Sequence, residues 1–255
     1  MTQIIGLIVK SNHYILIIIL LFPCIGLAAT DDILALTATP QMDGSTSYHL
    51  SLKVITAIAL ISILPALLMT VTSFTRVFIV LAIVRQAIGM ANIPTNQILI
   101  GLSLLLTLFI MSPTLSDINK NALQPYLEGK ISEHDAITES IEPFKQFMLD
   151  QTRKDDLNLL SQIAGRREDS DEASKISLPT LMTAFITSEL KTAFQIGVII
   201  FIPFLLIDLV VASILMSMGM MMLSPQVISL PLKIMLFVMV NGWTVIIGSL
   251  ANSFN

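Results

Sequence analysis

The 255-residue chain is poor in charge and cysteine, and each shortage excludes a class of protein. Only 13% of its residues are charged, about half the share found in soluble domains. Its single cysteine, Cys24, can form no internal disulfide and no cysteine-based metal site. A formal net charge of −4, without basic patches interleaved with aromatics, argues against nucleic acid as a partner. The hydrophobic content of 54% and the mean hydropathy of +0.82 are typical of a membrane protein.

Catalytic and metal-binding signatures are also missing from the sequence. The chain contains no G-x-S-x-G, no H-E-x-x-H, no phosphate-binding P-loop and no Gly-rich dinucleotide fingerprint. Its three histidines are isolated from one another, at His13, His49 and His134. We therefore expect no catalytic residues, no cofactor and no metal site.

The first residues have the composition of a secretory signal peptide. A weakly basic start, an apolar run at 14–22 and small residues at Ala28–Ala29 follow that pattern. The run is shorter than the roughly 20 residues that cross a bilayer. We expect residues 1–29 to be cleaved and 30–50 to form a periplasmic N-terminal segment. A signal anchor that stays attached is the alternative.

Two apolar blocks flank a polar insert. Residues 117–175 hold 13 of the 18 acidic and 8 of the 14 basic side chains. The uncharged runs around them suffice for four membrane-length helices. We expect an all-α membrane protein with a first apolar hairpin at 51–113, an insert at 114–180 and a second hairpin at 181–255. Because positive loops tend to stay cytoplasmic, the acidic insert and both mature termini are assigned to the periplasmic side.

The insert carries its own helix signals. Ser132, with an acidic residue three positions later, predicts a helix start. Pro143 predicts the first turn of a second helix, on which Phe144 and Phe147 share a face. A further short helix is expected at 155–164. The insert is either a small cap that packs on itself or a surface for subunit packing.

Prolines and charges inside the apolar blocks do not fit helices that simply face lipid. Pro65 and Pro203 are predicted helix breaks that need neighbouring protein to satisfy the freed carbonyls. Charged residues in such stretches usually face a protein interior or an aqueous path, often in pairs. The residues expected to be buried and paired are Arg85, Glu189, Lys191, Asp208 and Lys233.

The partners of these charges can be narrowed by sign and spacing. Glu189 and Lys191 are two positions apart and point in different directions on a helix, so neither is the other's main partner. Lys233 and Asp208 are the candidates of the right sign. Arg76 is instead expected to reach the lipid headgroups.

The stretch "MSMGMMMLSP" concentrates methionine at one turn. Methionine is unbranched and can repack around different neighbours, and its thioether gives ions and water no strong ligand. In several copies around an axis, Met220, Met221 and Met222 would form a compliant apolar constriction. Gap filling within one hairpin is the alternative. The turn itself is expected at Gly219 and Pro225.

The two apolar blocks show a weak internal sequence similarity. "PALLM" precedes "GMANIP" in the first block, and "PFLLI" precedes "GMMMLSP" in the second. Such a repeat is common in transport proteins, so a stand-alone secondary transporter of a small solute is the alternative function.

Long contiguous stretches resemble one known family. "LPALLMTVTSFTRVFIVLAIVRQAIG" (64–89), "PTNQILIGLSLLLTLFIMSP" (94–113) and the region 187–223 are similar to the flagellar biosynthetic protein FliP family. The resemblance implies an export-gate subunit that forms a helical pore for unfolded substrates. It also implies a bacterial inner-membrane location within the flagellar basal body. The partners implied are further copies of the chain, FliQ-like and FliR-like subunits and other export-gate proteins.

The same resemblance assigns roles to particular residues. In such complexes bent hairpins pack around a central axis, and the loop matching Met220 to Met222 lines the narrowest part of the channel. Glu189 and Lys233 match charged positions expected to pair within the assembly.

Overall fold

The computed structural model describes residues 36–40, 46–50, 52–90, 92–165, 176–220 and 223–254. The predicted signal peptide at 1–29 lies outside the described residues. The chain divides after Pro65 into two compact units.

The first unit contains a short antiparallel hairpin followed by a helix. Strand β1 (Leu36–Pro40) pairs with β2 (Thr46–Leu50), with Leu36 opposite Leu50. Helix α2 (Leu52–Val71) follows and continues past the division between the units. The sequence did not predict this hairpin, because its strands are only five residues long and half of their residues are Thr, Ala or Ser rather than an alternating apolar pattern.

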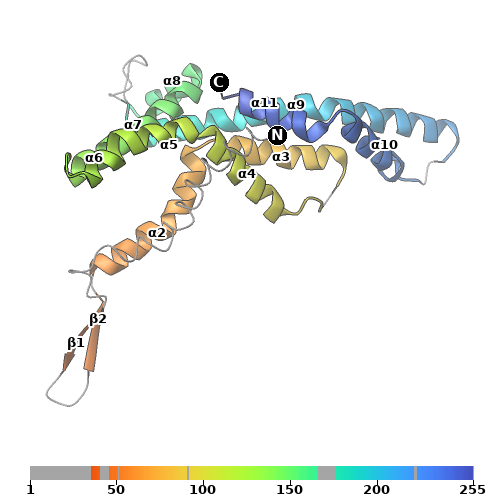
Figure 1. Cartoon of the computed structure of the whole chain (residues 1–255). Coiled ribbons are helices and arrows are strands. Elements are labelled where there is room, and N and C mark those ends of the chain that lie inside the picture. Colours follow the sequence, from red (N-terminus) through yellow and green to blue (C-terminus); the bar gives the residue numbers. More distant parts are fainter. Residues whose placement is uncertain are drawn as a thin grey trace, which may run out of the picture. The chain divides into compact units, whose positions relative to one another are not determined.

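The second unit is helical throughout its described residues, as the sequence predicts (Figure 1). Its elements in chain order are α3 (Phe74–Ile88), α4 (Asn96–Ile110), α5 (Ser112–Ile118), the π-helical turn η1 (Asn119–Leu123), α6 (Gln124–Leu127), α7 (Glu133–Gln151), α8 (Lys154–Ile163), α9 (Leu178–Ser217), α10 (Pro225–Met239) and α11 (Gly242–Asn252).

The apolar helices are bent, but not at the predicted prolines. Pro65 lies inside α2 and Pro203 inside α9, so neither ends its helix. The prediction of breaks was wrong: both prolines lie on exposed faces of their helices, where each removes one N–H donor without ending the helix. The chain bends instead by 81° between residues Pro65–Val71 of α2 and α3, by 58° between α4 and the stretch Ser112–Leu127 that holds α5, η1 and α6, and by 63° between α10 and α11. The last bend includes Asn241, whose φ of 50° is one that Asn adopts more readily than most residues.

Among the described residues, α9 is the one unbent helix that is long and apolar enough to cross a membrane. If each bent pair counts as a single span, up to four spans are possible. Helix α9 continues through Asp208 as one 40-residue helix.

The main core lies between α3 and α9, which run side by side in Figure 1. Val77, Val80, Leu81 and Val84 of α3 are fully buried there. The helices approach closely at Gly197, where an added Cβ would lie 2.4 Å from Ile83 Cδ1. Helix α4 packs on α3, and α10 packs on α9, so each apolar block forms a hairpin.

The insert packs against the first part of α9 rather than only on itself. Met148 of α7 and Leu157 of α8 are buried against Leu181 and Phe185 of α9. Figure 1 shows α7 and α8 near one end of α9, while the turn to α10 lies at the other.

Several local predictions for the insert can be checked against these helices. Ser132 is the N-cap of α7, where its Oγ accepts from the Asp135 N–H at 3.2 Å, so the predicted start is confirmed. The helix expected at 155–164 is also confirmed, as α8. Pro143 does not begin a helix, because α7 continues through it. The carbonyl that this proline leaves unpaired belongs to Glu139, on the exposed side of the helix, where water can satisfy it.

The tight approach of α3 and α9 leads to a stability prediction. Gly197→Leu should lower the midpoint of thermal unfolding of the purified chain in detergent, because overpacking costs roughly 1–3 kcal/mol. Gly101→Leu in α4 is the matched control, since a Cβ there meets nothing within 4 Å. Equal midpoints for the two variants would contradict the close packing at Gly197.

Candidate functional site

A buried ion pair joins α3 to α9. Arg76 is 2% exposed and Glu189 is fully buried. Arg76 Nε donates to Glu189 Oε2 at 2.9 Å, and Nη2 donates to Glu189 Oε1. This two-pronged contact is the strongest geometry available between an arginine and a carboxylate.

The remaining donors of Arg76 bring in two more segments. Nη1 donates to the Ser253 carbonyl at 2.8 Å and to the Ser253 hydroxyl at 3.1 Å. Nη2 also donates to Gln151 Oε1 of α7 at 3.1 Å. The Phe254 ring lies 3.8 Å from the guanidinium carbon, a cation–π contact. One guanidinium therefore ties α3, α7, α9 and the segment after α11 together.

This network corrects the predicted partners of two residues. Within the chain Glu189 pairs with Arg76, not with Lys233, and Arg76 does not reach toward headgroups. The sequence had no signal for Gln151, Ser253 or Phe254 as further members. A lone arginine beside an apolar run is ambiguous, because its long stem permits either exposure or burial.

A second polar cluster attaches α8 to α9. Lys191 pairs with Asp156 of α8, although the sequence suggested Asp208 as its partner. Ser188 Oγ donates to Asp156 Oδ2 at 2.8 Å, and the Arg153 backbone N–H donates to Ser188 Oγ at 3.0 Å. Burial raises the pKa of Asp156, but the hydrogen bonds and charges around it outweigh this effect and hold the pKa below its ordinary value of 3.8.

The other three predicted charges, Asp208, Lys233 and Arg85, lie within the hairpins. Lys233 Nζ donates to Asp208 Oδ2 at 2.6 Å, which joins α10 to α9. Ser229 Oγ donates to Asp208 Oδ1 at 2.5 Å. In the first hairpin, Arg85 Nη1 donates to the Pro94 carbonyl at 3.1 Å and to Asn96 Oδ1 at 2.7 Å.

The methionine-rich turn ends α9 at a left-handed glycine. Gly219 has φ +75°, its N–H donates to the Met216 carbonyl at 3.1 Å, and the Met220 N–H donates to the Leu215 carbonyl at 3.0 Å. This is the bonding of a Schellman motif, and it agrees with the predicted turn. The side chains of Met216, Met218 and Met220 are exposed.

Two further turn residues complete the comparison with the sequence. Pro225 is the first residue of α10, where its missing N–H costs nothing. Met221 and Met222 lie outside the described residues.

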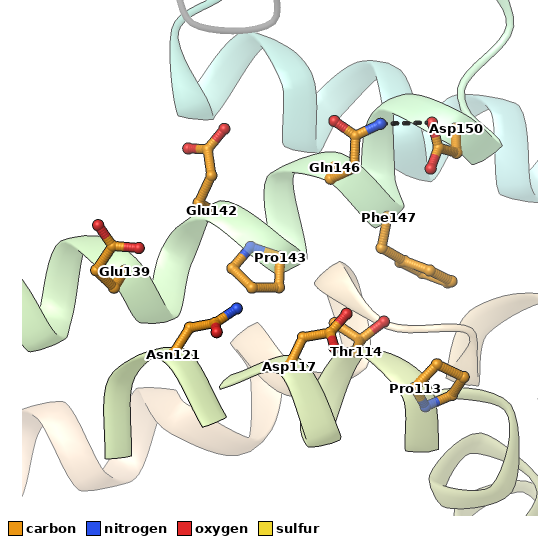
Figure 2. Close-up of a pocket in the computed structure, with 10 residues that line it drawn as sticks. All are labelled: Pro113, Thr114, Asp117, Asn121, Glu139, Glu142, Pro143, Gln146, Phe147 and Asp150. Carbon is orange, nitrogen blue, oxygen red and sulfur yellow. Dashed lines mark hydrogen bonds between the residues drawn. The ribbon is translucent and has the colours of Figure 1, made fainter. Parts of the chain in front are cut away.

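A surface pocket of about 420 Å³ lies between α5, η1 and α7 (Figure 2). Its lining includes the carboxylates of Asp117, Glu139, Glu142 and Asp150, and Gln146 Nε2 donates to Asp150 Oδ1 at 2.8 Å. Phe147 projects from α7 at one side, and its ring packs against Phe185 and Phe254 with centroid separations of 5.9 and 6.2 Å. Within the described part of the chain, no group of three metal-ligating side chains is placed to hold an ion.

The buried pair predicts unequal effects for two glutamate substitutions. Glu189→Ala should destabilise the protein by roughly 3–5 kcal/mol, because it leaves Arg76 buried and unpaired. Glu128→Ala removes an exposed pair with Lys130 and should cost less than about 1 kcal/mol. Thermal unfolding in detergent measures both, and equal losses would refute the role of the buried pair.

The α8 cluster predicts acid sensitivity. Because the folded pKa of Asp156 is depressed, its contribution to stability is present above pH 3.8 and is lost as the pH falls through the folded value. Asp156→Asn should therefore flatten the loss of unfolding temperature in this acidic range. Asp155→Asn, at the exposed neighbouring position of α8, should leave the acid response of the parent chain intact.

Comparisons with known proteins match this chain over most of its length. The model of the FliP family matches residues 57–250. The flagellar biosynthetic protein FliP of Bacillus subtilis is 53% identical over 205 residues, which cover 80% of this chain and 92% of the relative. The proteins of the same name from Cereibacter sphaeroides and Pectobacterium carotovorum are each 48% identical. The matches cover 83% of this chain and 70% of the relative in the first case, and 84% and 83% in the second. The chain belongs to the FliP family, as its resemblance predicted.

Proposed function

We propose that this chain is a pore-forming, non-enzymatic subunit of the flagellar type III protein export gate. In this role it passes unfolded substrates across the bacterial inner membrane, within the flagellar basal body. Membership of the FliP family is the observation that carries the proposal.

The exposed apolar surface supports assembly. Helix α9 exposes large apolar side chains along most of its second half, and α4 and α10 do the same. Apolar surface this extensive is covered by lipid or by protein partners. The partners that we propose are further copies of the chain, FliQ-like and FliR-like subunits and other export-gate proteins. The exposed large apolar residues of α9 are Leu190, Phe194, Val198, Ile199, Ile202, Leu205, Leu206, Leu209, Val210, Ile214 and Met216.

The methionine turn is the proposed constriction. A single copy has little use for the exposed methionine side chains that precede and include Met220. Repeated around an axis, Met220, Met221 and Met222 would form an apolar ring that excludes ions, because thioethers provide neither charge nor strong hydrogen bonds. The flexibility of methionine would let the ring yield to different substrate side chains.

The insert and both mature termini are assigned to the periplasmic side. The acidic balance of residues 117–175 supports this orientation, since positively charged loops are retained in the cytoplasm. The docking of α7 and α8 on the first part of α9 then leaves the methionine turn at the far end of that helix.

A secondary transporter remains the second candidate, and the similarity of the two hairpins favours it. Gly89 and Gly219 both end a long helix in the left-handed conformation with the same hydrogen bonds, and both are followed by methionine. Internal duplication of this kind is frequent among transporters.

Native mass spectrometry of the detergent-purified chain, expressed with and without its FliQ-like and FliR-like subunits, separates these functions. The export-gate proposal expects several copies together with both partner types, because the apolar faces require covering. A stable monomer that moves a small solute in vesicles would overturn it.

Alanine substitution tests the constriction. Replacing Met220, Met221 and Met222 together should increase ion leakage through the assembled complex in planar bilayers, because the ring loses most of its apolar volume. Met235→Ala, an exposed methionine of α10, controls for methionine loss away from the turn. Unchanged conductance of the triple variant would refute the constriction.

A further inference from the structure

The two limbs of the second hairpin are joined by a polar contact set well back from the methionine turn. Asp208 lies on α9, and Ser229 and Lys233 lie one helical turn apart on α10. Both donors reach the same carboxylate, at 2.5 and 2.6 Å. Ser229 is fully buried and Lys233 is 5% exposed, so this contact is shielded on the α10 side. We call these three residues the clasp.

The turn of the first hairpin lies beside the clasp. A cavity of about 320 Å³ is lined by Asp208 and Lys233 and, from the first hairpin, by Gln86, Gly89 and Met90. An added Cβ on Gly89 would lie 3.4 Å from Leu230 Cδ1 of α10. The first hairpin therefore contacts the helix that continues from the methionine turn.

The conformation of this first turn is fixed by its own hydrogen bonds. The Gly89 N–H donates to the Gln86 carbonyl at 3.0 Å, and the Met90 N–H donates to the Arg85 carbonyl at 3.3 Å. Gly89 has φ +92°, which side chains other than glycine rarely adopt. Arg85 also holds the start of α4 through Pro94 and Asn96. The turn thus presents a rigid surface to α10.

We infer that the clasp, backed by the Gly89–Met90 turn, fixes the spacing of α9 and α10 and thereby positions Met220. Two buried donors on α10 converge on one carboxylate of α9, so α10 can slide or splay only by giving up both bonds. Removing the ammonium leaves the partly exposed Asp208 carboxylate with only the Ser229 donor, and an incompletely paired charge draws in water. Any effect of the clasp on ion conductance rests on the proposed function, whereas its effect on the spacing of α9 and α10 does not.

The spacing can be measured by spin labels in the assembled complex. Labels on Val210 and Val227, both exposed, report the separation of α9 and α10 beside the turn. Cys24 is replaced by Ser, and excess unlabelled copies suppress distances between subunits. Lys233→Met should lengthen and broaden the distance distribution. An unchanged distribution would overturn the inference.

Two variants keep the test decisive if Lys233→Met does not fold. Ser229→Ala removes one donor and leaves the ion pair, so it should broaden the distribution in the same direction but less. The reversed pair, Asp208→Lys with Lys233→Asp, should return it toward the parent distribution. Glu128→Gln with Lys130→Met removes an exposed ion pair of the insert and should change nothing. A distribution unaffected by Ser229→Ala, or reversed pairs that stay as broad as Lys233→Met, would count against the clasp.

The contribution of the first hairpin has its own matched control. Gly89→Ala strains a left-handed turn that contacts α10, whereas Gly129→Ala strains a similar turn that has nothing within 4 Å of the new Cβ. Gly89→Ala should broaden the distribution of distances between the spin labels, and Gly129→Ala should not. Equal distance distributions for the two variants would exclude the Gly89–Met90 turn as a support for the position of α10.

Conductance separates this inference from the proposed function. If the clasp positions Met220, Lys233→Met should raise the leak several-fold, as the triple methionine variant does. Suppose that the triple methionine variant leaks ions, whereas Lys233→Met neither leaks nor changes the distance between the spin labels. That result would overturn the clasp alone. If neither the triple methionine variant nor Lys233→Met leaks ions, the constriction is overturned. The distances between the spin labels would still decide whether the clasp exists.

Discussion

The structure depends on one charged contact in a dry interior, between Arg76 and Glu189. Removing two charges from water is costly, and a single hydrogen bond would not compensate. Here the carboxylate receives two donors, and the guanidinium is further satisfied by Ser253, Gln151 and the face of Phe254. Gln151 comes from α7, whereas Ser253 and Phe254 come from the segment after α11. The pair therefore acts as a geometric constraint, because it is complete only when both hairpins and the insert occupy their places.

The polar insert is joined to the apolar hairpins by this network and by the α8 cluster. Lys191 lies less than one helical turn beyond Glu189 along α9, and both Lys191 and Ser188 of α9 donate to Asp156 of α8. The insert is therefore fixed at two levels of the same helix, by apolar contacts around Phe185 and by these polar bonds. This arrangement accounts for two of the three charged residues of α9, Glu189 and Lys191, and the third, Asp208, pairs with α10.

The sequence predicted the helical fold, the hairpins, the cap at Ser132, helix α8 and the turn at Gly219, because each follows from local composition and spacing. Of the charges that it indicated as buried, Glu189 and Lys233 are buried, but the Lys191 side chain is half exposed, and the buried Arg76 and Asp156 were not predicted. It did not give their partners, since Glu189 and Arg76 are far apart in sequence and charge sign alone permits several pairings. Pro65 and Pro203 misled because the loss of one backbone hydrogen bond at each proline does not end either helix. The β1–β2 hairpin had too little periodicity to be recognised.

The length of α9 has a consequence for where the protein can sit. At 1.5 Å per residue its 40 residues extend about 60 Å, roughly twice the hydrocarbon thickness of a bilayer. Glu189 and Met218 are therefore separated by about 44 Å along one unbroken helix. Such a helix fixes the distance between its two ends. It holds the methionine turn at a fixed distance from the insert, so a rigid displacement of α7 and α8 would be transmitted along α9 to the turn.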